Sequence, residues 1–164
     1  MRRWLPKALL VIVLAAVAGL LLRQFAVGTV RVAGSSMENT LVGGDLALVT
    51  RGSWSPVRGD VVECRFPGRS GTYIKRIVAL PGDSVAFSGG LLSINGEVVD
   101  EPYASSVTED YAVQLEEGEY LALGDNRAES YDSRMEDMGP ISREDILGRV
   151  RWILYPMNRF GPIK

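Results

Sequence analysis

The sequence predicts a mainly β protein: an N-terminal transmembrane helix followed by a compact β-sheet or barrel-like domain that carries a small β-hairpin insertion. Residues 8–22, ALLVIVLAAVAGLLL, form an uncharged apolar run near the start of the 164-residue chain. Beyond it, apolar segments are short, rich in β-branched residues and separated by glycine, proline and aspartate, as in a many-stranded sheet. Asn95-Gly96 lies between two apolar stretches and is typical of a hairpin turn, since both central residues need positive φ.

The N-terminal apolar run has basic residues on both sides. It is shorter than the ~20 residues that usually span a bilayer, but apolar residues up to Val27 extend it. The positive-inside rule places residues 1–7 in the cytoplasm, a transmembrane anchor at 8–27 and the domain 28–164 outside the cytoplasm. We therefore expect a single-pass protein of the cell membrane. A removable secretory signal and a buried core helix are the alternatives.

The elements expected in the domain follow in order along the chain. We expect strands at residues 45–50, 60–66, 72–80, 84–87, 119–124 and 148–156, with the hairpin at 91–99. Residues 84–118 are expected to form the insertion, and the polar, acidic segment 100–118 a surface excursion. Residues 141–147, ISREDIL, favour a short helix with Ser142 as its N-cap.

Composition excludes several classes of chemistry. The chain has no histidine, so it cannot form a Ser-His-Asp triad, a Cys-His nucleophile or a histidine-ligated zinc site. Five of the eighteen Lys/Arg lie in residues 1–31, which contain no acid, so the remainder has thirteen basic against twenty acidic side chains. That acidic body argues against nucleic-acid binding. Cys64 is the single cysteine and is expected to be a small strand residue. No metal-ligand or phosphate-loop spacing occurs, so we expect no cofactor.

Only three of the cationic side chains are lysines, and Lys75 is the one within an apolar strand segment. It can be an edge lysine whose amine reaches water. It can also be a buried amine whose pKa is lowered by desolvation, so that it accepts a proton, which arginine cannot do. Two other segments favour the second interpretation. Residues 32–41, VAGSSMENTL, can present Ser36 in a tight turn, and residues 124–134, GDNRAESYDSR, are dense in charged and hydroxyl groups.

Together these segments resemble the boxes of bacterial type I signal peptidases (leader peptidases), the membrane-anchored Ser/Lys endopeptidases that remove signal sequences from exported preproteins. SMENTL resembles the family's Ser-Met-x-Pro-Thr-Leu box, and GDLALV and RGDVV resemble the elements that follow it. KRIVALPGD resembles the Lys-Arg…Pro-Gly-Asp box, and GDNRAESYDSR the last box. The boxes follow one another in the family's order from the anchor to about residue 134.

The resemblance implies roles for the matching residues. Ser36 resembles the nucleophile, Lys75 its general base, and Ser130 the hydroxyl that helps to orient the lysine amine. The backbone N–H of Ser36 would form part of the oxyanion hole. Gly34 stands where some members have a serine that adds a donor to this hole, so that donor is missing here. Asn39 stands where proline is usual, which puts the rigidity of the loop after Ser36 in doubt.

Four charged residues complete the expected site. By the same resemblance, Arg76 and Asp125 would form a structural ion pair. Asp132 and Arg134 would hold the last box near the dyad.

The implied function is a serine endopeptidase that removes N-terminal signal peptides at the membrane surface through an acyl-enzyme, with small residues preferred at positions −1 and −3. Its expected partners are secretory preproteins, the lipid bilayer and, nearby, the protein translocation machinery, without a metal or cofactor. One alternative is a specialised Ser/Lys peptidase that matures a single pilin or conjugation substrate. Another is an anchored β-domain that binds a partner without catalysis. Self-cleaving repressor-type proteases share the dyad but carry a DNA-binding domain, whereas this chain has an apolar N-terminal segment.

Overall fold

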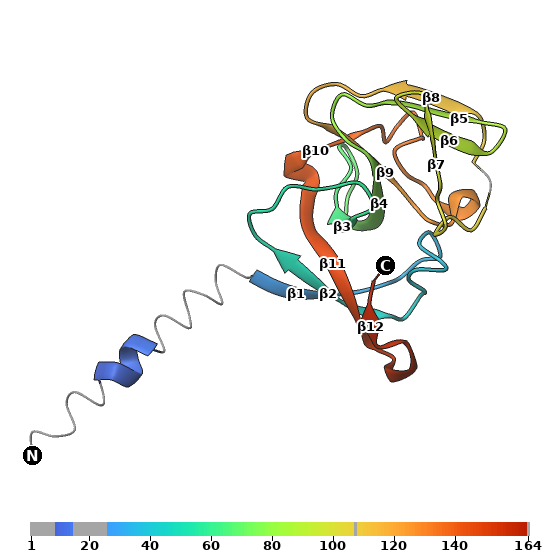
Figure 1. Ribbon diagram of the computed structural model, residues 1–164. Helices are drawn as coiled ribbons and strands as arrows, with labels where there is room; N and C mark the ends of the chain where they lie inside the picture. The colour runs from blue at the N-terminus through green and yellow to red at the C-terminus, as the bar shows by residue number, and fades with distance from the viewer. Residues whose placement is uncertain (1–8, 15–25, 107, 164) are drawn as a thin grey trace, which may run out of the picture.

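The computed structural model describes residues 9–14, 26–106 and 108–163 (Figure 1). Residues 9–14 are helical. Within these described stretches, no helix has the length and apolar character needed to cross a membrane. Most of the predicted anchor, 8–27, lies outside the described residues, and its last two positions, Ala26 and Val27, are the first residues of strand β1.

Eight strands form one curled antiparallel sheet, so the predicted mainly β fold is confirmed (Figure 1). Their order is β1-β2-β11-β3-β4-β9-β10, with β12 paired to β11, and no pairing between β1 and β10 closes the described part of the sheet into a barrel. The strands are β1 (Ala26–Arg31), β2 (Leu46–Arg51), β3 (Val61–Cys64), β4 (Tyr73–Ala79), β9 (Glu119–Leu123), β10 (Ile141–Ser142), β11 (Ile146–Tyr155) and β12 (Gly161–Pro162).

A second, four-stranded sheet is formed within the stretch 84–118. Its order is β7-β6-β5-β8, built from β5 (Ser84–Ser88), β6 (Leu91–Ile94), β7 (Glu97–Val99) and β8 (Tyr111–Gln114). It lies in the chain between β4 and β9, which pair directly in the main sheet. Apolar residues of both sheets share one buried cluster: Val78, Ala79, Val85, Phe87, Leu92, Ile94, Leu115, Leu121 and Leu123.

The predicted hairpin at Asn95-Gly96 is confirmed. Strands β6 and β7 pair from Ile94 opposite Glu97, which leaves a two-residue loop. Both loop residues have positive φ, +54° at Asn95 and +84° at Gly96, as a type I′ turn requires.

The predicted helix at 141–147 is wrong. Residues 141–142 form β10, and β11 begins at Ile146, so only one 3₁₀ turn, η2 (Arg143–Asp145), fits between them. Ser142 does cap this turn, since its backbone N–H and hydroxyl donate to the Asp145 carboxylate at 3.0 and 2.7 Å. Two further 3₁₀ turns are η1 (Arg127–Glu129) and η3 (Met157–Arg159).

Segment 100–118 is more than a surface excursion. It contains β8, and the side chains of Thr108 and Glu101 pack against a buried arginine of the last box. The acidic composition suggested full solvation, but one of its carboxylates has a buried cationic partner.

Strand β4 lies in the interior of the main sheet, between β3 and β9. Five of its seven residues are buried, including Lys75. Lys75 is opposite Val62 of β3, whose side chain has no solvent exposure. The lysine is therefore not at a sheet edge, which removes the edge interpretation.

Candidate active site

Ser36 lies in the turn that follows β1. Its neighbour Met37 is only 1% exposed and packs in a cluster with Val32, Leu41 and other residues of β2, β3 and β11. The backbone of the turn is also tied to the last box, because Asn126 donates from its N–H to the Ser36 carbonyl at 3.0 Å and from its side chain to the Ser35 carbonyl at 3.2 Å. These contacts hold the half-buried Ser36 hydroxyl over the sheet.

The Lys75 amine reaches Ser36 from β4. Its Nζ lies 2.9 Å from Ser36 Oγ and 3.0 Å from Ser130 Oγ. The Ser130 hydroxyl donates to Asp132 Oδ2 at 2.5 Å, so its oxygen is left to accept from the lysine. Because Ser130 accepts one N–H of the amine, the lone pair of an unprotonated Lys75 can face the Ser36 hydroxyl.

Asp132 is fixed by several donors. Arg134 contacts both of its carboxylate oxygens, at 2.8 Å from Nε and 3.0 Å from Nη2, and the Gly124 N–H donates to Oδ2 at 3.0 Å. Burial alone would raise the pKa of Asp132. The charge of Arg134 and the hydrogen bonds from Arg134, Ser130 and Gly124 hold this pKa below its usual value. Asp132 is therefore an ionised acceptor that keeps the Ser130 hydroxyl turned away from Lys75.

Burial lowers the pKa of Lys75 below its ordinary value. The negative charges of Asp132 and Asp125 act against this, while Arg134 acts with it. The amine is 2% exposed, so desolvation penalises its charged form. A larger fraction of this lysine is unprotonated near neutral pH than of a lysine in water.

Gly124 allows the close packing of the site, a role that no local sequence pattern indicates. A Cβ on Gly124 would lie 2.2 Å from Ser130 Oγ and 2.4 Å from the Ser36 carbonyl oxygen. Only hydrogen at this position lets the turn of Ser36 and the loop of Ser130 meet over β9. The residue lies within the box GDNR, but a single sequence carries no signal of how closely two loops approach.

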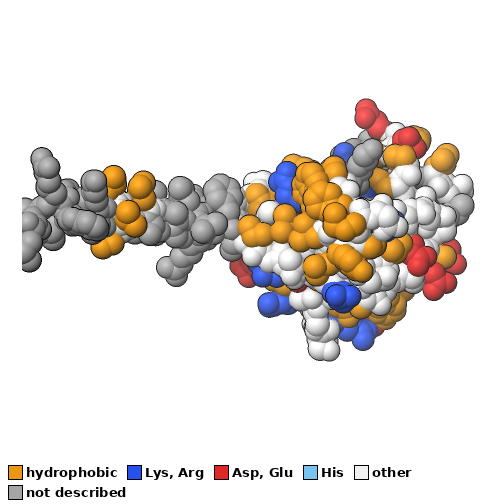
Figure 2. Space-filling model, turned by 90° about the horizontal axis from the view of Figure 1, so that it is seen from below, with side chains coloured by type: hydrophobic (Ala, Val, Ile, Leu, Met, Phe, Trp, Pro, Cys, Tyr) orange, Lys and Arg blue, Asp and Glu red, His pale blue; other side chains and the backbone are white. Residues whose placement is uncertain are grey.

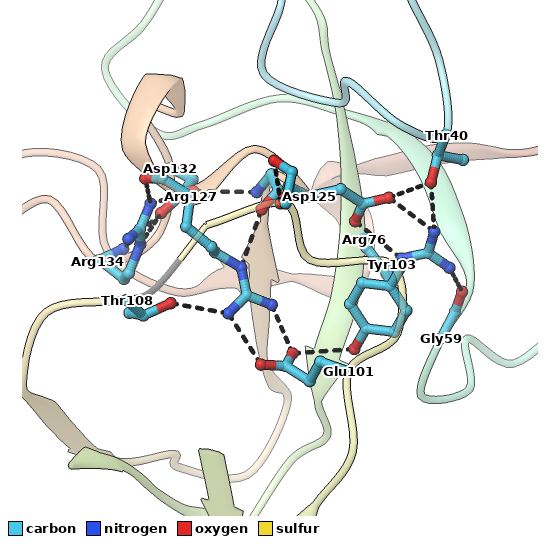
Figure 3. Close-up of polar contacts among 12 residues, drawn as sticks. Thr40, Gly59, Arg76, Glu101, Tyr103, Thr108, Asp125, Arg127, Asp132 and Arg134 are labelled. Carbon is cyan, nitrogen blue, oxygen red and sulfur yellow. Dashed lines mark hydrogen bonds and ion pairs between the residues drawn. The ribbon is translucent and has the colours of Figure 1, made fainter. Parts of the chain in front are cut away.

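Arg76 and Asp125 form a buried bidentate ion pair beside the dyad (Figure 3). Arg76 donates from Nε and Nη2 to the two carboxylate oxygens at 2.9 and 2.8 Å, and from Nη1 to the Gly59 carbonyl at 2.8 Å. Thr40, from the same turn as Ser36, donates to Asp125 at 2.5 Å. The ring of Tyr103 lies 4.0 Å from the guanidinium. The pair thus joins the serine turn, β4 and the last box.

A second buried ion pair, not anticipated from the sequence, joins Arg127 to Glu101 (Figure 3). Arg127 also donates to the Thr108 hydroxyl at 2.9 Å and to the Gly124 carbonyl at 3.0 Å. Glu101 precedes Arg127 by 26 residues and lies in the connection after β7, so no local pattern relates the two. The pair fastens the second sheet's connection to the loop that carries Ser130.

The two departures from the family pattern have different structural settings. At Gly34 a Cβ would meet nothing within 4 Å, so a side chain can be accommodated there. Asn39 has φ of +83°, which asparagine tolerates and proline cannot adopt. The turn after Ser36 therefore has a backbone conformation that excludes the usual proline.

A groove of about 350 Å³ opens beside Ser36. One wall is the end of β1 and the residues that follow it, and the other is Thr72 with the start of β4. Val30, Val32 and Ile74 give it an apolar part, and Arg31 with Thr72 a polar part. An extended peptide could lie in this groove with a carbonyl at Ser36.

The remaining titratable groups offer no other chemistry at this site. In the described ranges, no group of three Cys, Asp or Glu side chains is placed to hold a metal ion. Burial raises the pKa of the Cys64 thiol to about 12, so it stays protonated as a small buried strand residue. What the site brings together is an alcohol, an amine with a lowered pKa and a hydroxyl that orients the amine, which is the arrangement of an activated serine nucleophile.

Comparison with known proteins agrees with this chemistry. The family described as signal peptidase, peptidase S26, matches residues 1–155. A signal peptidase I P of Bacillus subtilis subsp. natto is 32% identical over 93% of this chain and 90% of the relative, and a signal peptidase I of Bacillus licheniformis is 34% identical over 90% and 87%. The crystal structure of a signal peptidase I from Enterococcus faecalis V583 has 28% identity and a TM-score of 0.53, covering 58% of this chain and 97% of that one. The chain belongs to the signal peptidase family, peptidase S26, and is a serine endopeptidase.

Proposed function

We propose that the protein removes N-terminal signal peptides from exported preproteins by a Ser/Lys dyad, with Ser36 as nucleophile and Lys75 as general base. The observation that carries the proposal is the 2.9 Å separation between Ser36 Oγ and the amine of a lysine that is 2% exposed. A serine hydroxyl is a poor nucleophile unless a nearby base takes its proton. The substrate class is supported by the relatives, which are named signal peptidases.

The reaction begins when Ser36 Oγ attacks the scissile carbonyl carbon and its proton passes to Lys75 Nζ. The oxyanion accepts a hydrogen bond from the Ser36 backbone N–H. As the intermediate collapses, the C–N bond breaks and the Lys75 ammonium gives its proton to the leaving amine of the mature chain. A water molecule, deprotonated by Lys75, then hydrolyses the acyl ester and restores Ser36.

Ser130, Asp132 and Arg134 position the base in this mechanism. Arg134 orients Asp132, and Asp132 orients the Ser130 hydroxyl. Ser130 then accepts one N–H of the Lys75 amine and fixes its direction. Arg76 and Asp125 keep the serine turn against β4. None of these four charged side chains has to exchange a proton during the reaction.

The groove beside Ser36 would receive the residues that precede the cleavage site. Its volume is about 350 Å³, and its lining combines apolar residues with Arg31 and Thr72. We expect this groove to favour small apolar side chains at positions −1 and −3, because residues such as Val30, Val32 and Ile74 offer no hydrogen-bond partner to a buried polar group.

The location follows from residues 1–27. We propose that the apolar segment before β1 anchors the chain as a single span, with 1–7 in the cytoplasm and the sheet-forming domain outside it. Ala26 and Val27, the last two residues of the predicted anchor 8–27, belong to β1 instead. Substrates would then be cut at the membrane surface, close to where the translocation machinery delivers them. Basic flanks and an apolar centre in the sequence support this topology.

The test is cleavage of a panel of secretory precursors by the full chain in detergent. Ser36→Ala and Lys75→Arg should each abolish cleavage while the protein stays folded, since arginine keeps the charge but cannot accept the proton. Ser35→Ala is the matched control, because the neighbouring serine has no hydrogen bond to Lys75, and it should cleave normally. Processing of every precursor by Lys75→Arg would refute the dyad. Cleavage of only one precursor by the unmodified chain would favour a specialised peptidase.

A further inference from the structure

A pocket rich in arginine lies on the main sheet, with none of the Ser/Lys site residues in its lining. It has a volume of about 360 Å³ and is lined by Thr50, Arg51, Gly52, Ser53, Trp54, Arg149 and Arg151. We call it the arginine pocket. Three guanidinium groups and an indole around one cavity suit a ligand that is both anionic and partly apolar.

The arginine pocket is next to the point where the chain enters β1. Arg51, at the end of β2, pairs with Ala26, the first residue of β1. The Arg51 guanidinium lies over Gly28, where a Cβ would come within 3.0 Å of its Nη1. Figure 1 shows the loop after β2 beside this end of β1. If the apolar segment before β1 anchors the chain, the pocket lies at the level of the lipid headgroups.

The local charge is positive although the body is acidic. Two of the arginines are paired, Arg51 with Glu63 and Arg149 with Asp60, each at 2.7 Å. Arg151 is exposed, and its side chain has no hydrogen bond or ion pair with any residue that the structure describes. Nearby Arg143 donates only to backbone carbonyls, those of Ile146 and Trp54. Two cations thus remain without a carboxylate partner.

Trp54 gives the arginine pocket an amphipathic wall. Its half-buried ring lies 5.4 Å from the Arg143 guanidinium carbon and 6.0 Å from that of Arg149. Tryptophan is enriched at the membrane–water boundary, where its ring meets both headgroup and acyl region. Figure 2, seen from below, shows apolar side chains gathered on the body with basic side chains among them.

We propose that the arginine pocket binds the phosphate of an anionic phospholipid headgroup and so orients the body on the membrane. The inference rests on the membrane anchor of the proposed function. The acidic body is repelled by an anionic bilayer, so the face on which Arg143 and Arg151 lie together without a carboxylate partner is favoured to turn toward the lipid. Arg151 makes the main contact with the phosphate, and Arg51 and Arg149 line the site.

The experiment is native mass spectrometry of the full chain in detergent with equal amounts of phosphatidylglycerol and phosphatidylcholine. We expect retained phosphatidylglycerol to exceed phosphatidylcholine, and Arg151→Gln to reduce that preference about fivefold, the effect of one arginine near an anionic surface. Arg65→Gln is the matched control, because Arg65 is exposed and does not line the pocket. Arg51→Gln should act like Arg151→Gln, and thermal unfolding checks that each variant is folded.

Three results would overturn the inference: equal retention of the two lipids, equal effects of Arg65→Gln and Arg151→Gln, or binding of inorganic phosphate as tight as that of phosphatidylglycerol. The last would assign the pocket to free anions. Precursor cleavage in detergent is measured in parallel and should be unchanged in Arg151→Gln. If Ser36→Ala still cleaves, the proposed function fails while lipid retention stands. If lipid preference is absent while Ser36→Ala is inactive, only this inference fails.

Discussion

Gly124→Ala is the smallest change that should disable the site from outside the dyad. The new Cβ would lie 2.2 Å from Ser130 Oγ and 2.4 Å from the Ser36 carbonyl oxygen, whereas ordinary contact begins at 3.4 Å. The Ser36 turn and the Ser130 loop must therefore each move by about 1 Å to restore ordinary contact. A displacement of that size can cost about 100-fold in rate when it misplaces a catalytic group, and Ser130 supports Lys75 from 3.0 Å.

We expect kcat/KM of Gly124→Ala to fall about 100-fold on a peptide that contains a signal-peptide cleavage site. The added methyl group should also lower the free energy of unfolding by about 1–3 kcal/mol, as overpacking usually does. Activity and thermal unfolding are measured on the same preparation, so that loss of site geometry is distinguished from loss of the fold.

Gly161→Ala is the matched control. Gly161 lies in β12, and a Cβ there would meet nothing within 4 Å. This variant should keep the activity and stability of the unmodified protein. If Gly124→Ala retained kcat/KM within about threefold of that control, the close approach of the two loops would not matter to catalysis, and the argument from packing would fail.

Three further predictions concern the dyad and its turn. Because burial lowers the pKa of Lys75 below 10.5 and only the unprotonated amine is a base, kcat/KM should rise with pH through that lowered pKa. Asp132 raises the pKa of Lys75, so Asp132→Asn should move the rising limb of the pH–rate profile to lower pH; a limb that moves upward would contradict this. Gly34→Ser should raise kcat, by at most the roughly 100-fold of one oxyanion donor, while Gly34→Ala should not; equal values for the two variants would exclude a donor role. Asn39→Pro should lower the free energy of unfolding in urea by more than about 1 kcal/mol, because φ is +83° there, and Asn39→Gly should leave it unchanged; a stable proline variant would show that the turn can adopt another conformation.

Some features of the fold could be predicted because they depend on local pattern. The Asn95-Gly96 hairpin needs only two residues with positive φ between apolar stretches. Strand β1 was not predicted, because Ala26 and Val27 continue an apolar run and carry no turn signal to separate them from it. The segment 141–147 has helix-like spacing, but β10 and β11 take its two ends into the sheet, and tertiary pairing outweighs the local preference.

In the candidate site, too, features that depend on local pattern could be predicted, whereas features that depend on tertiary contacts could not. Lys75 could be singled out because a lysine within an apolar strand is chemically unusual, and its partners could be placed by resemblance to family boxes. The need for glycine at 124 depends on the distance between two loops, and Arg127 meets a carboxylate 26 residues away. Neither relation produces a periodic pattern or a pair of neighbouring residues in the sequence. Close approach and long-range charge pairing therefore had to come from the structure.

The second sheet is inserted between β4 and β9, which pair directly, so trimming it would leave the pairing of the main sheet intact. Shortening it would nevertheless have two consequences. The apolar faces of Val78, Leu121 and Leu123 would be opened to water, and Arg127 would lose the carboxylate that neutralises it at 1% side-chain exposure. A buried cation that has lost its carboxylate partner lowers the free energy of unfolding by about 3–5 kcal/mol. A trimmed version of this enzyme would therefore need a neutral residue at 127 as well as a new polar surface.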